Sequence, residues 1–330
     1  LNIQCGDHGL PPAKASFPLH CALMDHYLEG GYYPMGGGAA IVKAMTRAFK
    51  KYGGEIRTGV GVKRILLDKA NSSRHYHATG VELQNGEKIL AKRVISNTDP
   101  GKTFEMVGAG YLSKKLQLKL AKTRYSLTSL MFFITVSMDL RETGLDSGNI
   151  WMMPDRDMDD LYNELTTVNL LEKEDFATLF ISCSSLKDPT SYNGKEHTLE
   201  VVTFIGYDLF KSGLPSGEGY AAAYKNLKEK LCDKLVNNLS KAIPGLRENI
   251  IHLEMGSPTT NEFYINGTNG NVYGTEKGFY QTGPFSFTPK TEIENLYLCG
   301  ASIMAHGVAG SGDSGVKTAA IILKCREEDL

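Results

Sequence analysis

This sequence lacks an excess of positive or negative charge. Its 330 residues include 36 Lys+Arg and 37 Asp+Glu, which gives a formal net charge of −1. Because nucleic acid is bound by charge only where a basic field exists, the composition argues against a nucleic-acid partner. With 42% hydrophobic and 22% charged residues, the chain lies outside the composition of disordered proteins. Its length allows one large α/β domain or two interleaved ones.

Long apolar runs and a recognisable start are missing as well. The longest apolar stretch, Leu130 to Val136, is interrupted at Thr135 and is far shorter than the roughly 20 residues that cross a bilayer. The sequence opens at Leu1 without an initiator Met and without the basic-then-apolar pattern of a signal peptide, so we expect a trimmed chain.

Cysteine pairs and metal-ligand spacings are also absent. The six cysteines contain no C-x-x-C pair, so we expect mostly buried thiols in a reducing, cytoplasmic compartment. The acidic run Asp155, Asp157, Asp159 and Asp160 could hold a cation, but it lacks the turn glycine and distal Glu of a calcium loop and is more typical of a solvated loop. No metal site is predicted.

The hydrophobic pattern predicts a mixture of helices and strands. Apolar residues at helical spacing, stopped by turn residues, predict helices over 20–28, 39–52, 114–123, 220–242 and 308–324. Runs of β-branched and apolar residues predict strands over 55–67, 79–83, 88–91, 93–97, 129–139, 176–185, 199–207 and 295–299. Asn85-Gly86 is a strong hairpin signal, and the strands between 129 and 207 are expected to form a mostly antiparallel sheet.

One glycine-rich stretch imitates a dinucleotide-binding fingerprint. Gly310-Ser311-Gly312-Asp313-Ser314-Gly315 fits G-x-G-x-x-G, but that motif needs a following helix, a second strand and an acidic residue about 20 residues on. The chain ends at Leu330, so we interpret these residues as small side chains that let a helix pack closely on a sheet or a ligand.

Two glycine-rich turns are better candidates for a cofactor cleft. The strand expected at 295–299 runs through Gly300 toward a helix, and Gly36-Gly37-Gly38 opens another helix. Helix N-termini present free N–H groups that bind anions. We therefore expect these distant segments to build one cofactor cleft; structural turns without a ligand remain the alternative.

Four stretches together resemble the FAD-dependent phytoene desaturase, carotenoid isomerase and retinol saturase family. They are GGYYPMGG at 30–37, VISNTD at 94–99, NLYLCGAS at 295–302 and the Gly/Ser-rich helix through Ser314-Gly315. Their order and spacing fit along the whole chain. FPLH at 17–20, HYL at 26–28, LKDPT at 186–190 and GSPTTNEFY at 256–264 are most similar to the retinol saturase branch.

The resemblance implies a fold and a domain division. The expected class is α/β (α+β mixed), with an FAD/NAD(P)-binding Rossmann-like domain of the glutathione reductase type and an inserted β-rich substrate domain. The partial FAD-binding domain would span 32–100 and 286–330, the substrate-binding domain 101–285, and residues 1–31 would belong to the substrate domain or a cap. Family members begin with a strand, a true G-x-G-x-x-G turn and a helix that carries the FAD pyrophosphate. We expect the Rossmann-like domain to be incomplete at its N-terminus here.

The resemblance also implies cofactor contacts. Two turn glycines would approach FAD, one strand backbone would lie near the adenine, the turn after the last strand would lie near the pyrophosphate and ribityl chain, and a positive helix end would face the flavin pyrimidine edge. The residues concerned are Gly36, Gly37, Val62, Gly300, Ala301, Gly307, Val308 and Ala309. NAD(P) is the candidate electron partner.

Two further groups of residues are candidates for chemistry. His306 could donate a proton to the substrate carbon opposite the flavin hydride, with a role in the turn itself as an equal alternative. Aromatic residues could line a tunnel for a polyene, although aromatic strand residues more often form core. The aromatic candidates are Phe132, Phe133, Phe180, Phe204, Phe263, Tyr264 and Tyr280.

The function that we expect is an FAD-dependent oxidoreductase that saturates, forms or isomerises a carbon–carbon double bond of a long polyene, a retinoid or carotenoid, by flavin hydride transfer. Such substrates partition into lipid, so peripheral membrane contact through an apolar patch is expected. Two alternatives remain, a flavin amine oxidase-like enzyme and a flavin-free lipid-binding remnant.

Overall fold

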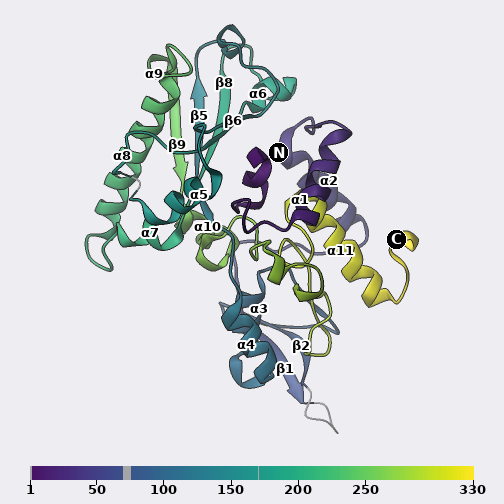
Figure 1. The fold of residues 1–330 in the computed structure, drawn as a ribbon. Coiled ribbons are helices and arrows are strands. Elements are labelled where there is room, and N and C mark those ends of the chain that lie inside the picture. The colour runs from purple at the N-terminus through teal and green to yellow at the C-terminus, as the bar shows by residue number, and fades with distance from the viewer. Residues whose placement is uncertain (1, 70–75, 170) are drawn as a thin grey trace.

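A five-stranded antiparallel sheet forms the upper part of the protein in Figure 1, a computed structural model that describes residues 2–69, 76–169 and 171–330. The strand order is β6-β7-β8-β5-β9. The strands are β5 (Thr128–Val136), β6 (Ile150–Met152), β7 (Leu179–Ser182), β8 (His197–Ile205) and β9 (Ile250–Gly256). The predicted antiparallel arrangement of this region is confirmed.

Alternation along β5 and β8 decides which side chains enter the core. Leu130, Phe132 and Ile134 point to one face of β5 and are fully buried, whereas the intervening Phe133 is 42% exposed. That face packs on α8 (Tyr220–Ser240), from which Leu231 and Leu235 enter the same cluster. Truncating one such side chain to Ala costs about 2–5 kcal/mol. Smaller helices complete this half: α6 (Ser184–Lys187), α7 (Tyr207–Ser212) and α9 (Leu246–Asn249).

The opposite face of the sheet is covered by α5 (Met158–Thr167). Tyr162 and Leu165 of this helix pack against Phe204 of β8. The strand predicted over 176–185 is shorter than expected: β7 ends at Ser182, because helix α6 begins at Ser184.

A second, three-stranded sheet lies at the lower end of Figure 1. Its antiparallel strands are β1 (Val62–Lys69), β2 (Tyr76–Leu83) and β3 (Lys88–Leu90). The hairpin predicted at Asn85-Gly86 is confirmed, with Gly86 at φ 88°. The prediction of a strand from residue 55 is wrong: Gly59 and Gly61 weaken the extended run, and β1 begins only at Val62.

Two short parallel strands join distant parts of the chain. β4 (Val94–Ser96) pairs with β10 (Leu296–Leu298), so that Val94 lies opposite Leu296. Asp99 caps α3 (Pro100–Val107), and α4 (Lys114–Lys122) follows. The apolar side chains of these elements form a second core around Phe104, Leu296 and Leu298.

The remaining helices lie toward the centre and right of Figure 1. They are the 3-10 helix η1 (Asn2–His8), α1 (Phe17–Leu28), α2 (Gly37–Lys51), α10 (Pro258–Ile265) and α11 (Gly307–Leu323). No residue of α2 is buried, although its apolar residues recur at helical spacing. Over the part of the chain that the structure describes, none of the helices is long and apolar enough to cross a membrane.

Candidate functional site

The turn after β10 is the first part of the candidate site. Gly300 has φ 94°, and a Cβ there would lie 1.9 Å from Oδ1 of Asn97, the residue that follows β4. The Gly300 N–H donates to Ser314 Oγ at 2.6 Å, and Thr318 Oγ1 donates to the Leu298 carbonyl at 3.0 Å. Helix α11 therefore packs back onto β10. The turn lies at the carboxyl ends of two parallel strands, which is where α/β sheets bind ligands.

The stretch at 310–315 that matches G-x-G-x-x-G lies inside α11 and does not form a turn. A Cβ on Gly310 would lie 2.6 Å from Ala305, so this glycine permits close packing, while Gly312 and Gly315 face open space. The interpretation of this stretch as helix-packing residues holds for Gly310 and Ser314.

The N-terminus of α11 is open. Gly307, Val308 and Ala309 are exposed, Gly307 has φ 79°, and the N-cap residue His306 makes no side-chain capping bond. The first-turn N–H groups of a helix have no partner within the helix. This end of α11 can therefore bind an anion or the electron-rich edge of a ring.

The glycines that open α2 are held by the large sheet. Gly36 and Gly37 both have positive φ, 84° and 65°. The Gly36 N–H donates to the Asp188 carboxylate at 2.7 Å. Val62, at the start of β1, pairs with Leu83. The cofactor contacts assigned to Gly36, Gly37 and Val62 stay predictions.

His306 is tied to the N-terminal segment. Its Nε2 is hydrogen-bonded to the Asp7 carbonyl, and its ring lies 4.4 Å from the Tyr273 ring, centroid to centroid. A carbonyl only accepts, so Nε2 carries the proton and the buried Nδ1, which has no partner among the described residues, does not. Burial, with Lys277 nearby, lowers the pKa of His306 to about 4. The imidazole is neutral at neutral pH, so the proton-donor role predicted for it would first require proton uptake.

One buried lysine and two buried histidines lie close to His306 and the Gly300 turn. Lys277 is 2% exposed and donates to the Ala301 carbonyl at 2.6 Å; burial lowers its pKa to about 8. His8 is 1% exposed and shares a hydrogen bond of 3.1 Å with His20 of α1, and burial lowers the pKa of His8 to about 4. The sequence analysis missed Lys277 and His8, which no local pattern marks, and it noted His20 only as part of the FPLH stretch.

A small cavity opens beside the same residues. It measures about 150 Å³, which is below the roughly 300–1,000 Å³ of typical ligand pockets. Its lining residues come from the large sheet, α5, η1 and the segment around residue 273: Asp7, Trp151, Met153, Tyr162, Thr178, Leu179, Phe180, Val202, Phe204 and Tyr273.

The aromatic-tunnel hypothesis, the less favoured of the two interpretations, fits only two of its residues. Only Phe180 and Phe204, of the seven candidates, line the cavity. Phe132 points to the opposite face of the sheet, into the core under α8. The others are on the surface, because strand alternation or a loop position turns them outward: Phe133, Phe263, Tyr264 and Tyr280.

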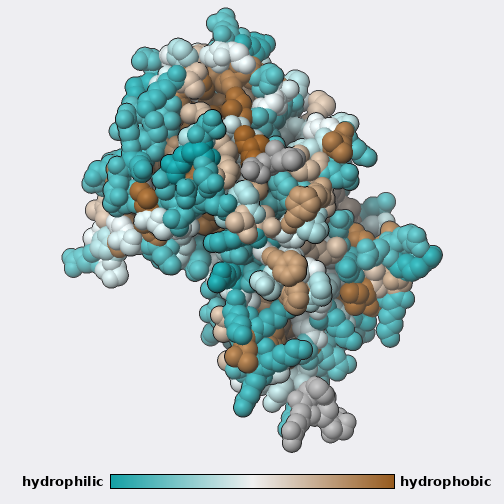
Figure 2. Space-filling model, in the orientation of Figure 1, coloured by the Kyte–Doolittle hydropathy of each residue, from teal (hydrophilic) through white to brown (hydrophobic). Residues whose placement is uncertain are grey.

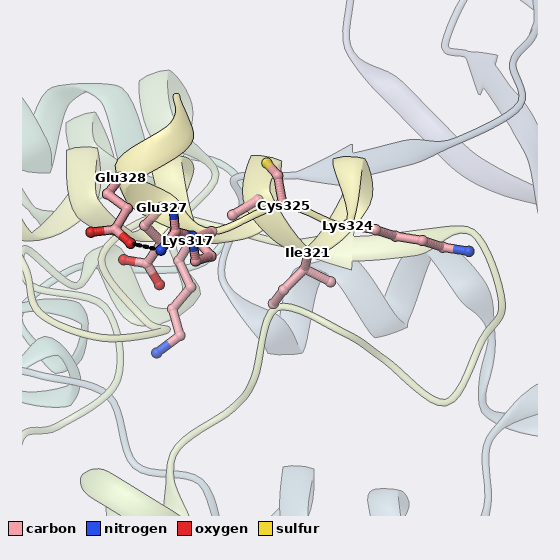
Figure 3. A pocket seen from close by; sticks show the side chains of 8 residues that line it. Lys317, Ile321, Lys324, Cys325, Glu327 and Glu328 are labelled. Carbon is pink, nitrogen blue, oxygen red and sulfur yellow. Dashed lines mark ion pairs between the residues drawn. The ribbon is translucent and has the colours of Figure 1, made fainter.

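Two other candidate regions carry no site chemistry. A shallow pocket of about 550 Å³ lies at the C-terminal end of α11, lined by Lys317, Ile321 and Cys325 among others (Figure 3). Its first lining residue, Lys317, is ten residues, about 15 Å, from the N-terminus of α11 that belongs to the candidate site. In the acidic run, Asp157 caps α5, and no metal-binding group of His, Cys, Asp or Glu occurs within the described ranges.

Comparison with known proteins gives relatives along nearly the whole chain. No protein-family model matches. The chain is 29% identical to the all-trans-retinol 13,14-reductase of Danio rerio over 98% of its length, and 29% identical to the chloroplastic prolycopene isomerase of Arabidopsis thaliana over 90%. The resemblance predicted from the sequence is thereby confirmed. The chain spans about half the length of these relatives, 54% and 46% respectively.

Solved structures give the fold. An oxidoreductase from Methanosarcina mazei superimposes with a TM-score of 0.64 at 15% identity, covering 98% of this chain and 63% of that one. Cyclohexylamine oxidase from Brevibacterium oxydans superimposes with a TM-score of 0.54 at 15% identity, covering 98% and 62%. The fold is shared with oxidoreductases. The predicted mixed α/β fold class is confirmed, whereas the predicted domain boundaries stay predictions.

Proposed function

We propose that this chain is part of an FAD-dependent oxidoreductase that acts on a carbon–carbon double bond of a long polyene, a retinoid or carotenoid. The observation that carries the proposal is its similarity, over 90% or more of its length, to two proteins whose names specify a retinol reductase and a lycopene-type isomerase. Both names describe changes at double bonds of polyenes, and the mostly apolar cavity beside the Gly300 turn has room for one end of such a molecule.

The residues around the turn fit FAD. Gly300 leaves no room for a side chain at the end of β10, and the backbone of Gly300 and Ala301 would hold the pyrophosphate and ribityl chain. The open N–H groups of Gly307, Val308 and Ala309 would hold the pyrimidine edge of the flavin. Within the described residues no G-x-G-x-x-G turn is available for the pyrophosphate, so this chain supplies only part of the cofactor site.

Residues of this chain hold the Gly300 turn in place and can donate or accept protons. Bound FAD would supply the hydride transfer, with NAD(P) as the proposed electron partner. Lys277 fixes the turn through the Ala301 carbonyl, and its ammonium, with a pKa of about 8, holds a proton at Nζ at neutral pH. His306 fixes the same turn through the Asp7 carbonyl, and its Nδ1 can accept a proton. The side chains of Phe180 and Phe204 keep water from the substrate side.

Peripheral membrane contact is part of the proposal. Phe279, Tyr280 and Phe285, here named the aromatic patch, are 62%, 81% and 50% exposed, and their rings lie 5.3 to 6.4 Å apart. A cluster of exposed aromatic side chains marks a protein–protein or membrane contact, and aromatic side chains are enriched at membrane–water interfaces.

A basic helix lies beside the aromatic patch. Lys119 of α4 donates to the Ser286 carbonyl at 2.7 Å, and the Arg124 N–H donates to Gln281 at 2.7 Å. Residues 109–124 and 277–290 contain no Asp or Glu, and Figure 2 shows brown side chains among teal ones around α4. The neighbouring carboxylates are Glu276 and Glu292, and Glu292 is engaged by Ser113 at the start of α4. This charge suits an anionic lipid surface.

Amine oxidation is the second candidate function. The cavity contains one carboxyl group, that of Asp7, surrounded by aromatic side chains, and such a group could bind an ammonium substrate. Burial raises the pKa of Asp7, which disfavours the charged carboxylate that an ammonium ion needs. The observation therefore favours a neutral substrate.

A spectrum of the purified protein tests the proposal. The chain is purified with excess FAD, and its visible absorbance is recorded together with that of a version extended at its N-terminus. Bound flavin in either, followed by conversion of retinol or a carotene, supports the proposal. Flavin with turnover of an amine only would favour the second candidate. Polyene binding without flavin in either version would leave a lipid-binding protein.

A further inference from the structure

The cavity has two walls of different character. Strands β6 to β8 supply an apolar wall that includes Phe180, Val202 and Phe204. The opposite wall, from η1, α5 and the segment at 273, carries Asp7, Tyr162 and Tyr273. The polar wall adjoins the Gly300 turn, because Tyr273 lies against His306 and the Asp7 carbonyl is hydrogen-bonded to His306.

Tyr162 is the more deeply buried of the two phenols on the polar wall, since Tyr273 is only partly buried. It is 5% exposed, yet its phenolic oxygen makes no hydrogen bond to the residues that the structure describes. Buried phenols usually have a partner. The hydroxyl oxygen of Tyr162 is also accessible to solvent, whereas the Oγ1 atom of Thr178, on the same cavity, is fully buried. Because Tyr162 also lines the cavity, its free hydroxyl is available to a ligand there.

The neighbours of Tyr162 decide which ligand group suits it. Asp7 accepts from Tyr27 Oη at 2.8 Å, and burial raises the pKa of its carboxyl. Burial, with Cys5, Tyr273 and Asp7 nearby, raises the pKa of the Tyr162 phenol, so it stays protonated and neutral. A neutral group that both donates and accepts is matched by an alcohol, whereas a pure hydrocarbon would leave the phenol without a partner.

We propose that Tyr162 is a specificity-determining residue that hydrogen-bonds a terminal hydroxyl of the polyene, so that this chain takes a polyene alcohol in preference to a polyene hydrocarbon. This inference rests on the proposed function. A site built to pair a hydroxyl rejects the analogue that lacks it, because the protein group is then left unpaired. With a cavity of about 150 Å³, the chain encloses the hydroxyl end of the polyene and leaves the rest outside.

Binding measurements without flavin test the inference. All-trans-retinol and a hydrocarbon analogue lacking its hydroxyl are titrated into the chain, with quenching of Tyr and Trp fluorescence as the readout. We expect Tyr162→Phe to weaken retinol binding by roughly three- to tenfold, the usual value of one hydrogen bond, and to leave hydrocarbon binding unchanged. Thr178→Val is the matched control, since it removes a hydroxyl from the same cavity that does not reach the ligand space.

The outcomes separate this inference from the function on which it rests. Equal weakening of both ligands by Tyr162→Phe, or no weakening of either, overturns the role of Tyr162 and leaves the polyene proposal intact. Failure of wild-type protein to bind either polyene argues against the proposed function and removes the basis for the inference. Because Tyr162→Phe keeps the ring, circular dichroism and the unfolding midpoint should match those of the wild type. If the variant does not fold, the wild-type protein still tests the inference: it should bind retinol more tightly than the hydrocarbon analogue, and equal affinity for the two overturns the inference.

Discussion

The backbone N–H of Gly36 donates to the carboxylate of Asp188, 152 residues further along the chain, at 2.7 Å. Asp188 is 1% exposed, and its other oxygen accepts from the N–H and hydroxyl of Thr190. These contacts, Thr190 first, hold the pKa of Asp188 below its usual value. The LKDPT stretch noted in the sequence thus fixes the left-handed turn that opens α2, which is a turn predicted to approach the cofactor.

Replacing Asp188 by Asn should loosen this turn. Both carboxylate oxygens accept hydrogen bonds, and an amide offers only one accepting oxygen, so either Gly36 or Thr190 must lose its partner. We expect faster amide hydrogen exchange in peptides covering residues 33–38, measured by mass spectrometry. Asp146→Asn is the control, because only its Oδ1 accepts, from Gly148, in an exposed turn. Unchanged exchange in the Asp188 variant would show that the turn is held by other contacts.

Adding one methyl group at Gly300 should be far more harmful than at Gly312. At Gly300 the backbone is in the left-handed region and the new Cβ would overlap Asn97 Oδ1, so we expect a loss of about 2–5 kcal/mol in the free energy of unfolding. Gly312 is a helical residue facing open space, and Gly312→Ala should stabilise the protein by about 0.5–1 kcal/mol. Urea unfolding measures both. Equal effects at the two positions would contradict the packing of β4 against the Gly300 turn.

Local signals predicted most elements, and contacts between distant segments escaped the sequence analysis. The helix that became α8 and the Asn85-Gly86 hairpin depend on neighbouring residues only, and both are present. The sequence could not decide which aromatic residues line a cavity and which form core, because the face on which a strand residue lies depends on the partners of the sheet. Phe132 lies in the core and Phe180 lines the cavity. Asp7 reaches the site from the other end of the chain, 299 residues from His306, and no local pattern could reveal that.

Stability should depend on pH below neutrality through His8 and His306. Their folded pKa values are lowered to about 4, whereas an unfolded His titrates near 6.5, so between these values the unfolded state binds more protons. The free energy of unfolding therefore falls as the pH is lowered from about 6.5 to 4, by roughly 1.4 kcal/mol per pH unit for each proton, and is independent of these groups above that range. The pKa of Asp7 is raised, so at the acidic end of this pH range Asp7 increases the free energy of unfolding as the pH falls.

His8→Gln tests this pH dependence. Chemical unfolding gives the free energy of unfolding of wild type and variant across the same pH range. Its change with pH should be smaller in the variant by the amount that corresponds to about one proton. His252→Gln, at a residue whose side chain is 62% exposed, is the control and should keep the wild-type slope. The buried histidine cluster would be refuted as the source if the two variants gave the same slope as wild type.

Membrane contact should depend on the aromatic patch and on α4 together. Sedimentation with phosphatidylcholine vesicles, with and without phosphatidylserine, measures binding. The triple variant Phe279→Ser, Tyr280→Ser, Phe285→Ser should lose binding to both vesicles by at least about tenfold, since it removes the side chains that enter the interface. Lys115→Gln and Lys122→Gln should each weaken binding roughly fivefold, only where phosphatidylserine is present, and added salt should mimic them.

A second pair of exposed aromatic residues provides the matched control for this surface. Phe263 and Tyr264 of α10 are 81% and 77% exposed and in ring contact, as in the aromatic patch. Unlike the aromatic patch, they lie next to an acidic residue, Glu262, which accepts a hydrogen bond from Tyr207, and not beside a basic helix. Phe263→Ser with Tyr264→Ser should therefore keep wild-type vesicle binding. If this pair weakens binding as much as the triple variant does, general hydrophobicity and not the surface beside α4 governs contact. If the protein does not bind vesicles but binds heparin, and Lys115→Gln and Lys122→Gln weaken heparin binding, the basic face of α4 binds a polyanion and the membrane assignment is wrong.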